Sequence, residues 1–279
     1  MTEIKKTPDG IEVPPPGPND VLYEVEENIA TITLNRPTIL NAMNKNVLRL
    51  LDAALTRAND DADIHVVILR GAGRSFSAGG DLHAALYPDD DPAPGGLEVQ
   101  TKIWSLQKPV IASVRGHAIG QACELAGVCD LTIASETARF GEIQIRHGFG
   151  PPVLITPFLT SLKRAKEVLL LGEQIDAAEA KELGFVNKVV ADADLESETR
   201  LIATKMASLP QKAVRLNKLL VNRAYELAGF MDSLNYRDDP IVKALSDEES
   251  DDPVAQERQR ILREEGWQAF LKTRDVGYQ

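Results

Sequence analysis

The sequence has few cysteines, few histidines and no long apolar run. Its 279 residues include 2 cysteines and 4 histidines. Cys123 and Cys129 are too few for a disulfide framework, and their spacing is not a usual zinc spacing. The histidines form no metal motif, so we expect no metal site. No apolar stretch reaches the ~18 residues of a membrane helix, and no signal-peptide pattern is present. We therefore expect a cytoplasmic protein that does not associate with membranes.

Positive charge is scarce relative to negative charge. The 31 Lys and Arg residues are outnumbered by 42 Asp and Glu residues, which gives a formal net charge of −11. A protein of this sign repels the phosphates of nucleic acids and anionic membrane surfaces, so we expect neither as the main partner. The apolar content of 43% is ordinary for a globular chain. The length permits one or two domains with a sizeable core.

The most informative segment of the chain is residues 116–130, GHAIGQACELAGVCD. It follows an apolar run, residues 108–115, that predicts a buried strand, and a glycine-punctuated turn then opens a helix at about Gly120. Backbone N–H groups at a helix start have no partner within the helix, and the helix dipole adds positive potential there. Gln121 and Glu124 are three residues apart and share one face of the first turn. This pairing of a backbone donor with a carboxylate can stabilise an oxyanion and move a proton beside it.

A second segment has the same design. Residues 63–70 predict a strand, residues 71–80 a glycine-rich turn and residues 81–86 a helix. Gly79 and Gly80 have no Cβ, so the backbone can approach a ligand closely there. Taken alone, this segment is better explained as an ordinary tight turn, since it matches neither phosphate-loop pattern. Two such turns in one chain, the second with a carboxylate, indicate a ligand site.

Other segments are assigned from their patterning. Residues 1–20 are polar and contain PPPGP at 14–18, which is typical of an extended or disordered arm. Asn41 is expected to cap a helix over residues 42–58. Residues 88–96 are interpreted as a mobile loop beside the first glycine turn, where such loops often admit substrate. Further helices are expected at 162–171, 177–184, 195–209, 213–227 and 254–273.

Ordered motifs from about Val21 to about Asn222 resemble the crotonase (enoyl-CoA hydratase/isomerase) superfamily. The motifs are ITLNRP at 32–37, LNAM at 40–43, FSAGGD at 76–81, KPVI at 108–111, GHAIGQACELA at 116–126, CDL at 129–131, ARFG at 138–141 and AAEAKELGFVN at 177–187. Each motif is only moderately specific, but their order and spacing together are highly specific.

The resemblance implies an α/β fold, a crotonase-like spiral of ββα repeats followed by a C-terminal helical region that helps trimerisation. On this basis we expect a flexible N-terminal arm at 1–20, a spiral core at 21–200 and a helical region at 201–279. A homotrimer or a dimer of trimers is the implied assembly.

The resemblance also implies an acyl-CoA thioester as substrate, with coenzyme A as part of that substrate and no tightly bound cofactor. The thioester oxygen would lie between two backbone N–H groups, which map onto Gly80 and Gln121 and would stabilise an enolate. The family's first catalytic glutamate maps onto Glu124. The other residues implied at the substrate site are Arg36, Leu40, Ala78, Gly79, Asp81, Leu82, His83, Tyr87 and Gly120.

Two positions depart from the family pattern. The second N–H donor usually belongs to a glycine, and Gln121 keeps the donor but adds a side chain near the acyl group. The second catalytic glutamate falls where this chain has Gln144, which has the shape of glutamate but cannot exchange a proton at neutral pH. For the nearby Glu142 and His147 we expect a solvated or structural role ahead of a catalytic one. Replacing Gln144 by Glu is expected to raise hydration of short 2-enoyl-CoA substrates at least about tenfold.

Two classes of function remain open. The first is an enzyme on acyl-CoA thioesters, most simply an enoyl-CoA hydratase that adds water to a 2-enoyl-CoA, with Glu124 moving the protons. A double-bond isomerase is the main rival, and thioester hydrolysis is a third option. The second class is a non-catalytic acyl-CoA-binding protein. Glu124 argues against it, because an idle pocket does not need a carboxylate inside the oxyanion turn.

Overall fold

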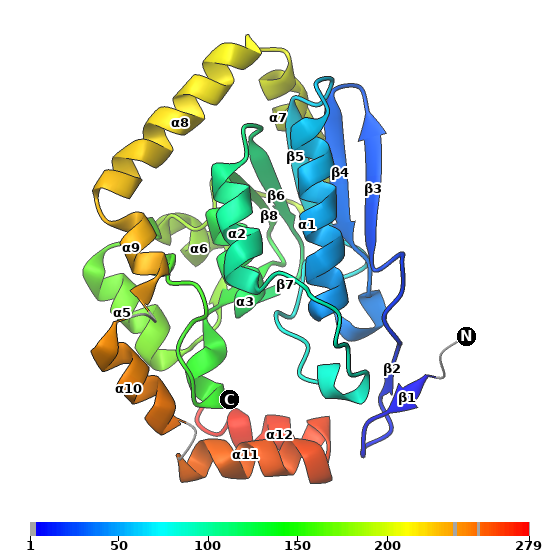
Figure 1. The fold of residues 1–279 in the computed structure, drawn as a ribbon, viewed down its shortest axis with the longest axis vertical. Coiled ribbons are helices and arrows are strands. Elements are labelled where there is room, and N and C mark those ends of the chain that lie inside the picture. Colours follow the sequence, from blue (N-terminus) through cyan, green and yellow to red (C-terminus); the bar gives the residue numbers. More distant parts are fainter. Residues whose placement is uncertain (1–3, 237–238, 250–251, 279) are drawn as a thin grey trace.

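A six-stranded sheet lies at the centre of the protein's computed structural model, which describes residues 4–236, 239–249 and 252–278. The sheet order is β11-β8-β6-β5-β4-β3 (Figure 1). All neighbouring strands are parallel except the antiparallel pair β3 and β4. The strands are β3 (Val21–Glu26), β4 (Ile29–Leu34), β5 (Val66–Gly71), β6 (Val110–Val114), β8 (Leu131–Ser135) and β11 (Lys188–Val190).

A smaller sheet has the order β10-β9-β7. It consists of β7 (His117–Ile119), β9 (Arg139–Gly141) and β10 (Ile175–Asp176). The chain passes from β6 to β7 and again from β8 to β9, so each of these two turns contributes one strand to each sheet. This repetition, with helices between the turns, is the expected spiral of ββα units, and the fold class is confirmed.

Helices cover both faces of the central sheet. On one face are α1 (Lys45–Asp60), α2 (Gly96–Ser105) and α3 (Gln121–Val128), and on the other is α7 (Leu195–Ala207). Successive side chains of β5 point to opposite faces of the sheet. Val67 and Leu69 belong to the larger core, whereas Val66 and Ile68 pack toward α7. The central strands β4, β5, β6 and β8 are accordingly mainly apolar on both faces, as expected for a parallel sheet.

The remaining helices are mostly C-terminal. They are η1 (Pro37–Ile39), η2 (Ala84–Leu86), η3 (Ile143–His147), α4 (Thr156–Leu159), α5 (Leu162–Leu171), α6 (Ala177–Leu183), η4 (Asp192–Asp194), α8 (Gln211–Leu227), α9 (Phe230–Leu234), α10 (Pro240–Glu249), α11 (Pro253–Glu264) and α12 (Trp267–Arg274). Within the described residues, no helix is both long and apolar enough to cross a membrane.

Helix α8 extends along one side of the molecule, and no residue of it is buried (Figure 1). One lysine anchors it to the core, because Lys218 Nζ donates to Asp130 Oδ2 at 2.7 Å and to the carbonyl oxygens of Ile103 and Lys108. Asp130 Oδ2 also accepts the N–H of Val110, the first residue of β6, at 2.7 Å. The ion pair therefore joins α8 to the base of the strand that leads toward β7 and α3.

Three local predictions were wrong in detail. The helix expected at residue 42 begins at Lys45, and its cap is Asn44, whose side chain accepts the N–H of Val47. The single helix expected over 254–273 is broken between α11 and α12 by Gly266, which has a φ of +92°. The segment 81–86 contains only the short helix η2.

The N-terminal arm contacts the rest of the chain, and its residues 1–3 lie outside the described part. Strands β1 (Lys5–Lys6) and β2 (Glu12–Val13) pair with each other. Tyr87 Oη donates to the Val13 carbonyl at 2.8 Å. Asp9 accepts the N–H of Gln268, in α12, at 2.9 Å. Residues 5–13 therefore lie against both η2 and the C-terminal helices.

Candidate active site

The two glycine turns lie side by side. The Ser77 N–H donates to the His117 carbonyl, and the Ile119 N–H donates to the Ser77 carbonyl, so residues 76–80 run parallel to β7. Gly79 has a φ of +91°, and a Cβ there would lie 2.4 Å from the Ile119 oxygen and 3.4 Å from the Gln121 nitrogen. Only glycine permits this approach of two backbones. It brings the residue after Gly79 next to the start of α3.

Among the described residues, two backbone N–H groups at this junction have no hydrogen-bond partner. Met43 bonds to the Gly79 carbonyl and to the Asp81 N–H, which leaves the intervening N–H of Gly80 unused. Gln121 is the first residue of α3, so its N–H has no acceptor within the helix. Neither N–H donates to any atom in the described part of the chain. Two adjacent unpaired donors beside a helix N-terminus are what an oxyanion requires.

A buried cluster of carboxylates and amides lies next to these donors. The side chain of Glu124, one turn into α3, is completely buried. Gln144 Nε2 donates to Glu124 Oε1 at 2.9 Å and to Glu142 Oε2 at 3.0 Å. Thr156 Oγ donates to Glu142 Oε1 at 3.0 Å, and Gln100 Nε2 lies 3.4 Å from Glu124 Oε2. Two carboxylates are therefore bridged by one amide nitrogen.

Glu142 is the part of this cluster that sequence analysis underrated. Its side chain is buried, and burial raises its pKa to about 7, although hydrogen bonds from Gln144 and Thr156 oppose the shift. Gln100 and Thr156 were missed altogether, because no motif marks them and tertiary packing alone brings them to the carboxylates. The one signal for Glu142 was its two-residue spacing from Gln144.

His147 lies elsewhere. Its ring stacks on Phe270 of α12, with the ring centroids 5.4 Å apart, and tilts against Phe149. Burial and the nearby positive charge of Arg274 lower its pKa to about 4. Its environment is that of a neutral ring packed among aromatic side chains.

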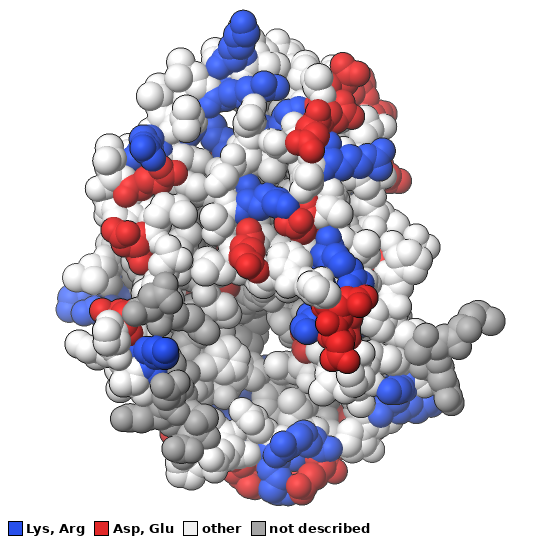
Figure 2. All heavy atoms as spheres, viewed as in Figure 1, with Lys and Arg blue, Asp and Glu red and all other residues white. Residues whose placement is uncertain are grey.

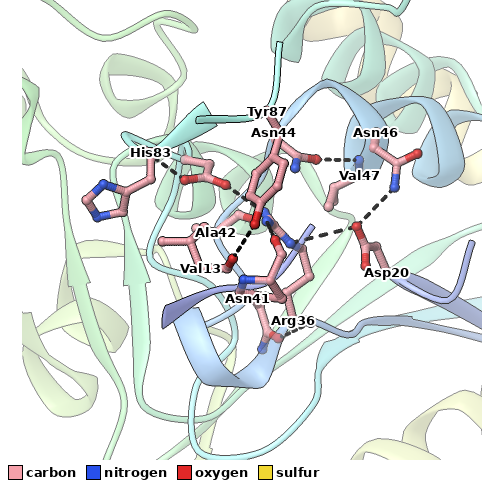
Figure 3. Close-up of polar contacts among 12 residues, drawn as sticks. Val13, Asp20, Arg36, Asn41, Ala42, Asn44, Asn46, Val47, His83 and Tyr87 are labelled. Carbon is pink, nitrogen blue, oxygen red and sulfur yellow. Dashed lines mark hydrogen bonds and ion pairs between the residues drawn. The ribbon is translucent and has the colours of Figure 1, made fainter. Parts of the chain in front are cut away.

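Arg36 and Asp81, both expected at the substrate site, bind each other beneath the first turn. Arg36 Nη1 donates to Asp81 Oδ2 at 2.7 Å and to the Ala42 carbonyl at 2.8 Å, and Arg36 Nε lies 3.7 Å from Asp20 (Figure 3). Asp81 Oδ1 accepts the N–H of His83. The guanidinium group is buried. These contacts hold the end of the first glycine turn, residues 71–80, against the segment that contains Arg36 and Ala42.

The remaining predicted residues surround the turn. The Leu40 carbonyl accepts the Ala78 N–H, and Leu82 is 40% exposed. His83 meets Trp267 of α12 edge-on, with centroids 5.7 Å apart, and Tyr87 is bonded to β2. His83 and Tyr87 both lie in the close-up of Figure 3.

The Gln121 side chain occupies space between the first turn and α2. Its Oε1 lies 3.7 Å from where a Gly80 Cβ would be, and its Nε2 lies only 1.9 Å from where a Gly96 Cβ would be. Because Gly96 has no side chain, it leaves space for the side chain of Gln121, the residue that stands where the family usually has a glycine. The extra bulk lies beside the N–H donor of Gly80.

The face seen in Figure 2 is hollowed between the C-terminal helices and the sheet region. Basic and acidic side chains are intermixed over it and do not gather into one basic patch. Among the described residues, no group of three or more His, Cys, Asp or Glu side chains could hold a metal ion.

Comparison with known proteins identifies the family. The enoyl-CoA hydratase/isomerase family model matches residues 24–279. The chain is 37% identical over 218 residues to the short-chain-enoyl-CoA hydratase of Clostridium acetobutylicum, covering 75% of this chain and 83% of that protein. It is 36% identical over 215 residues to the crotonyl-CoA hydratase of Syntrophomonas wolfei, covering 74% and 83%.

A solved structure agrees along nearly the whole chain. The enoyl-CoA hydratase/isomerase from Xanthobacter autotrophicus Py2 superposes with a TM-score of 0.83 at 34% identity, covering 93% of this chain and 98% of that one. The chain therefore belongs to the enoyl-CoA hydratase/isomerase family, which confirms the resemblance to the crotonase superfamily. It is an acyl-CoA-processing enzyme.

Proposed function

We propose that this enzyme adds water to the double bond of a 2-enoyl-CoA thioester. The observation that carries the proposal is the meeting of three groups at one junction: the unpaired N–H of Gly80, the unpaired N–H of Gln121 and the buried carboxylate of Glu124. The hydratase names of relatives that are 36–37% identical support it.

In the proposed addition each of these groups has a role. The thioester oxygen accepts hydrogen bonds from the Gly80 and Gln121 N–H groups, which stabilise the negative charge that builds up on it as the enolate forms. Glu124 takes a proton from water as the water oxygen bonds to C3, and it returns that proton to C2. One water molecule is thereby added, and the carboxylate is regenerated. The positive end of α3 adds to the stabilisation of the enolate.

Gln144 limits the proton chemistry to one residue. An amide does not titrate at neutral pH, so Gln144 holds Glu124 in place and does not share its proton. Glu142 is bonded to the other side of the same amide nitrogen. Glu124 is therefore the proton carrier in our mechanism. The contacts of Leu40, Ala78, Leu82, His83 and Tyr87 with the substrate are likewise part of the proposal.

A double-bond isomerase is the second candidate, favoured by the single directly placed carboxylate. Isomerisation needs one group that removes a proton from one carbon and returns it to another, and Glu124 alone meets that need. Thioester hydrolysis and non-catalytic binding stay in the test as further outcomes.

The deciding experiment offers the enzyme crotonyl-CoA, a 3-enoyl-CoA and a saturated acyl-CoA. Hydration removes the absorbance of the conjugated enoyl thioester and yields a product heavier by one water. Isomerisation creates that absorbance from the 3-enoyl substrate without a change in mass, and hydrolysis releases a free thiol. If none of these substrates is turned over although acyl-CoA binds, the proposed hydration fails.

We further propose that coenzyme A enters only as part of the substrate, that the enzyme is cytoplasmic and that it assembles as a homotrimer or a dimer of trimers. Support for assembly comes from α8, where Leu216, Leu219, Leu220 and Val221 are each more than half exposed in the single chain. An apolar face of this kind is typical of an interaction surface. Sedimentation equilibrium distinguishes trimer, hexamer and monomer.

A further inference from the structure

The orientation of the Gln144 amide is forced by its neighbours. An ionised carboxylate only accepts hydrogen bonds, whereas an amide has two N–H donors and one carbonyl acceptor. Glu124 and Glu142 flank the amide at 2.9 and 3.0 Å, so its nitrogen faces both of them and donates one N–H to each. The carbonyl Oε1 therefore bonds to neither carboxylate. That oxygen is buried and accepts no hydrogen bond in the described structure.

The unpartnered oxygen belongs to a group that lies at the oxyanion junction. The amide of Gln144 lies 3.8 Å from where a Cβ of Gly120 would be, and Gly120 immediately precedes the Gln121 N–H donor. A buried carbonyl oxygen without a hydrogen-bond donor is destabilising, because it has lost its bonds to water. A ligand that brings an O–H group to this place removes that cost.

We propose that Glu142 is a positioning residue for the hydration reaction. By accepting one N–H of Gln144, it holds the amide so that the other N–H fixes Glu124 and Oε1 is presented to the reacting water. The water then donates one O–H to Glu124 and the other to Gln144 Oε1, which leaves its oxygen lone pair directed at C3. This inference rests on the proposed hydratase function.

Glu142 does not itself deliver a proton. Its Oε2 accepts from Gln144 and its Oε1 accepts from Thr156, so both oxygens are occupied. A proton on Oε1 can be donated to the Thr156 hydroxyl, while Oε2 continues to accept from Gln144. The orientation of the amide therefore persists in either protonation state of Glu142.

The same geometry changes the expected effect of Gln144→Glu. From the sequence alone, this change restores a missing acid and raises the rate. In the structure it removes both N–H bonds and places a third carboxylate against two buried ones, and like charges at this separation cannot all ionise. We therefore expect the single variant to be slower than wild type. The exchange variant Glu142→Gln/Gln144→Glu gives the new acid an amide donor and should be at least tenfold faster than Gln144→Glu.

The test compares two substitutions of Glu142. Glu142→Gln keeps an oxygen that accepts the Gln144 N–H, so kcat should stay within about threefold of wild type. Glu142→Leu has similar bulk and no acceptor, so kcat should fall about 10–100-fold with KM little changed, in line with the cost of misplacing a reacting group. Thr156→Val is the matched control, because it touches Glu142 but leaves the Gln144 bond intact. A loss of kcat in Glu142→Gln as large as that in Glu124→Gln overturns the proposal, as does an unchanged kcat in Glu142→Leu.

A second measurement does not need turnover. In protein labelled with ¹⁵N-glutamine, both side-chain amide protons of Gln144 should exchange slowly with solvent in wild type and in Glu142→Gln. One of them should exchange faster in Glu142→Leu while the backbone spectrum is retained. Equal exchange in all three proteins overturns the positioning role. If the amide behaves as expected but no enoyl-CoA is hydrated, the proposed function fails while the orientation stands.

Discussion

Gly79→Ala tests whether the close approach of two backbones aligns the oxyanion donors. The substitution places alanine at a φ of +91°, which costs about 1–2 kcal/mol for an L-residue. The new Cβ would lie 2.4 Å from the Ile119 carbonyl oxygen, a backbone atom that cannot rotate away. Overpacking of this kind adds about 1–3 kcal/mol, so we expect a total loss of about 2–5 kcal/mol in the free energy of unfolding.

The clash with Ile119 should force the two backbone segments apart and thereby also lower kcat. Separating the segments moves Gly80 relative to Gln121, and loss of one oxyanion donor typically lowers kcat about 10²–10³-fold. Urea unfolding and turnover of crotonyl-CoA measure the two effects on one preparation. A variant that folds and turns over at a rate within twofold of wild type would show that the approach at Gly79 does not align the donors.

Substitutions at two other glycines distinguish the cost of the positive φ from the cost of the contact with Ile119. Gly229 has a φ of +93°, but a Cβ there meets nothing within 4 Å, so Gly229→Ala should show only the backbone cost and a normal kcat. Gly80→Ala keeps the N–H donor, and its Cβ meets only the Gln121 side chain at 3.7 Å. It should be close to wild type in urea unfolding. If Gly79→Ala destabilises the protein no more than Gly229→Ala does, the contact with Ile119 is not the source of the effect.

Four further predictions follow from the site and the fold. Glu124→Gln should lower kcat about 10²–10⁴-fold while acyl-CoA binding, measured by calorimetry, is kept; near-normal turnover would move the acid–base role elsewhere. Gly80→Pro should cost roughly 3–4 kcal/mol of transition-state stabilisation, read from kcat/KM, because it removes a donor. The pKa of Glu142 is raised from 4.5 to about 7 on folding, so the unfolding free energy should fall as pH rises across that interval, and Glu142→Gln should flatten this slope in urea titrations; an equal slope in the variant contradicts the assignment. Leu219→Asp/Leu220→Asp on α8 should yield a folded monomer in sedimentation, and an unchanged assembly would place the interface elsewhere.

Local pattern was enough to predict the two glycine turns and α3. A strand, a glycine turn and a helix are set by neighbouring residues, and the order of motifs identified the family. The helix cap was misplaced because Asn41 and Asn44 are both good caps, and the choice between them depends on tertiary contacts. Asn41 is instead used to bind the Ser75 and Phe76 carbonyls of the first turn.

The bridged carboxylates were beyond the reach of local pattern. Glu142 lies two residues from Gln144, but its burial depends on Thr156 and on the packing of segments distant in sequence. Gln100 reaches Glu124 only because α2 packs on α3. A residue that looked like a solvated neighbour of the site is thereby part of its hydrogen-bond network.

In the trimer that we propose, the anchoring of α8 connects the subunit contact to the end of α3, the helix that carries Glu124. Lys218, in the middle of α8, bonds to Asp130, which lies two residues beyond the end of α3 and also holds the first residue of β6. In that proposed assembly, neighbouring subunits that bind α8 would also restrain α3 and β6, the two elements that lead to the oxyanion donors. Loss of a neighbouring subunit would remove that restraint. The protein concentration at which the proposed assembly dissociates would then also be the concentration below which the oxyanion donors are held less rigidly.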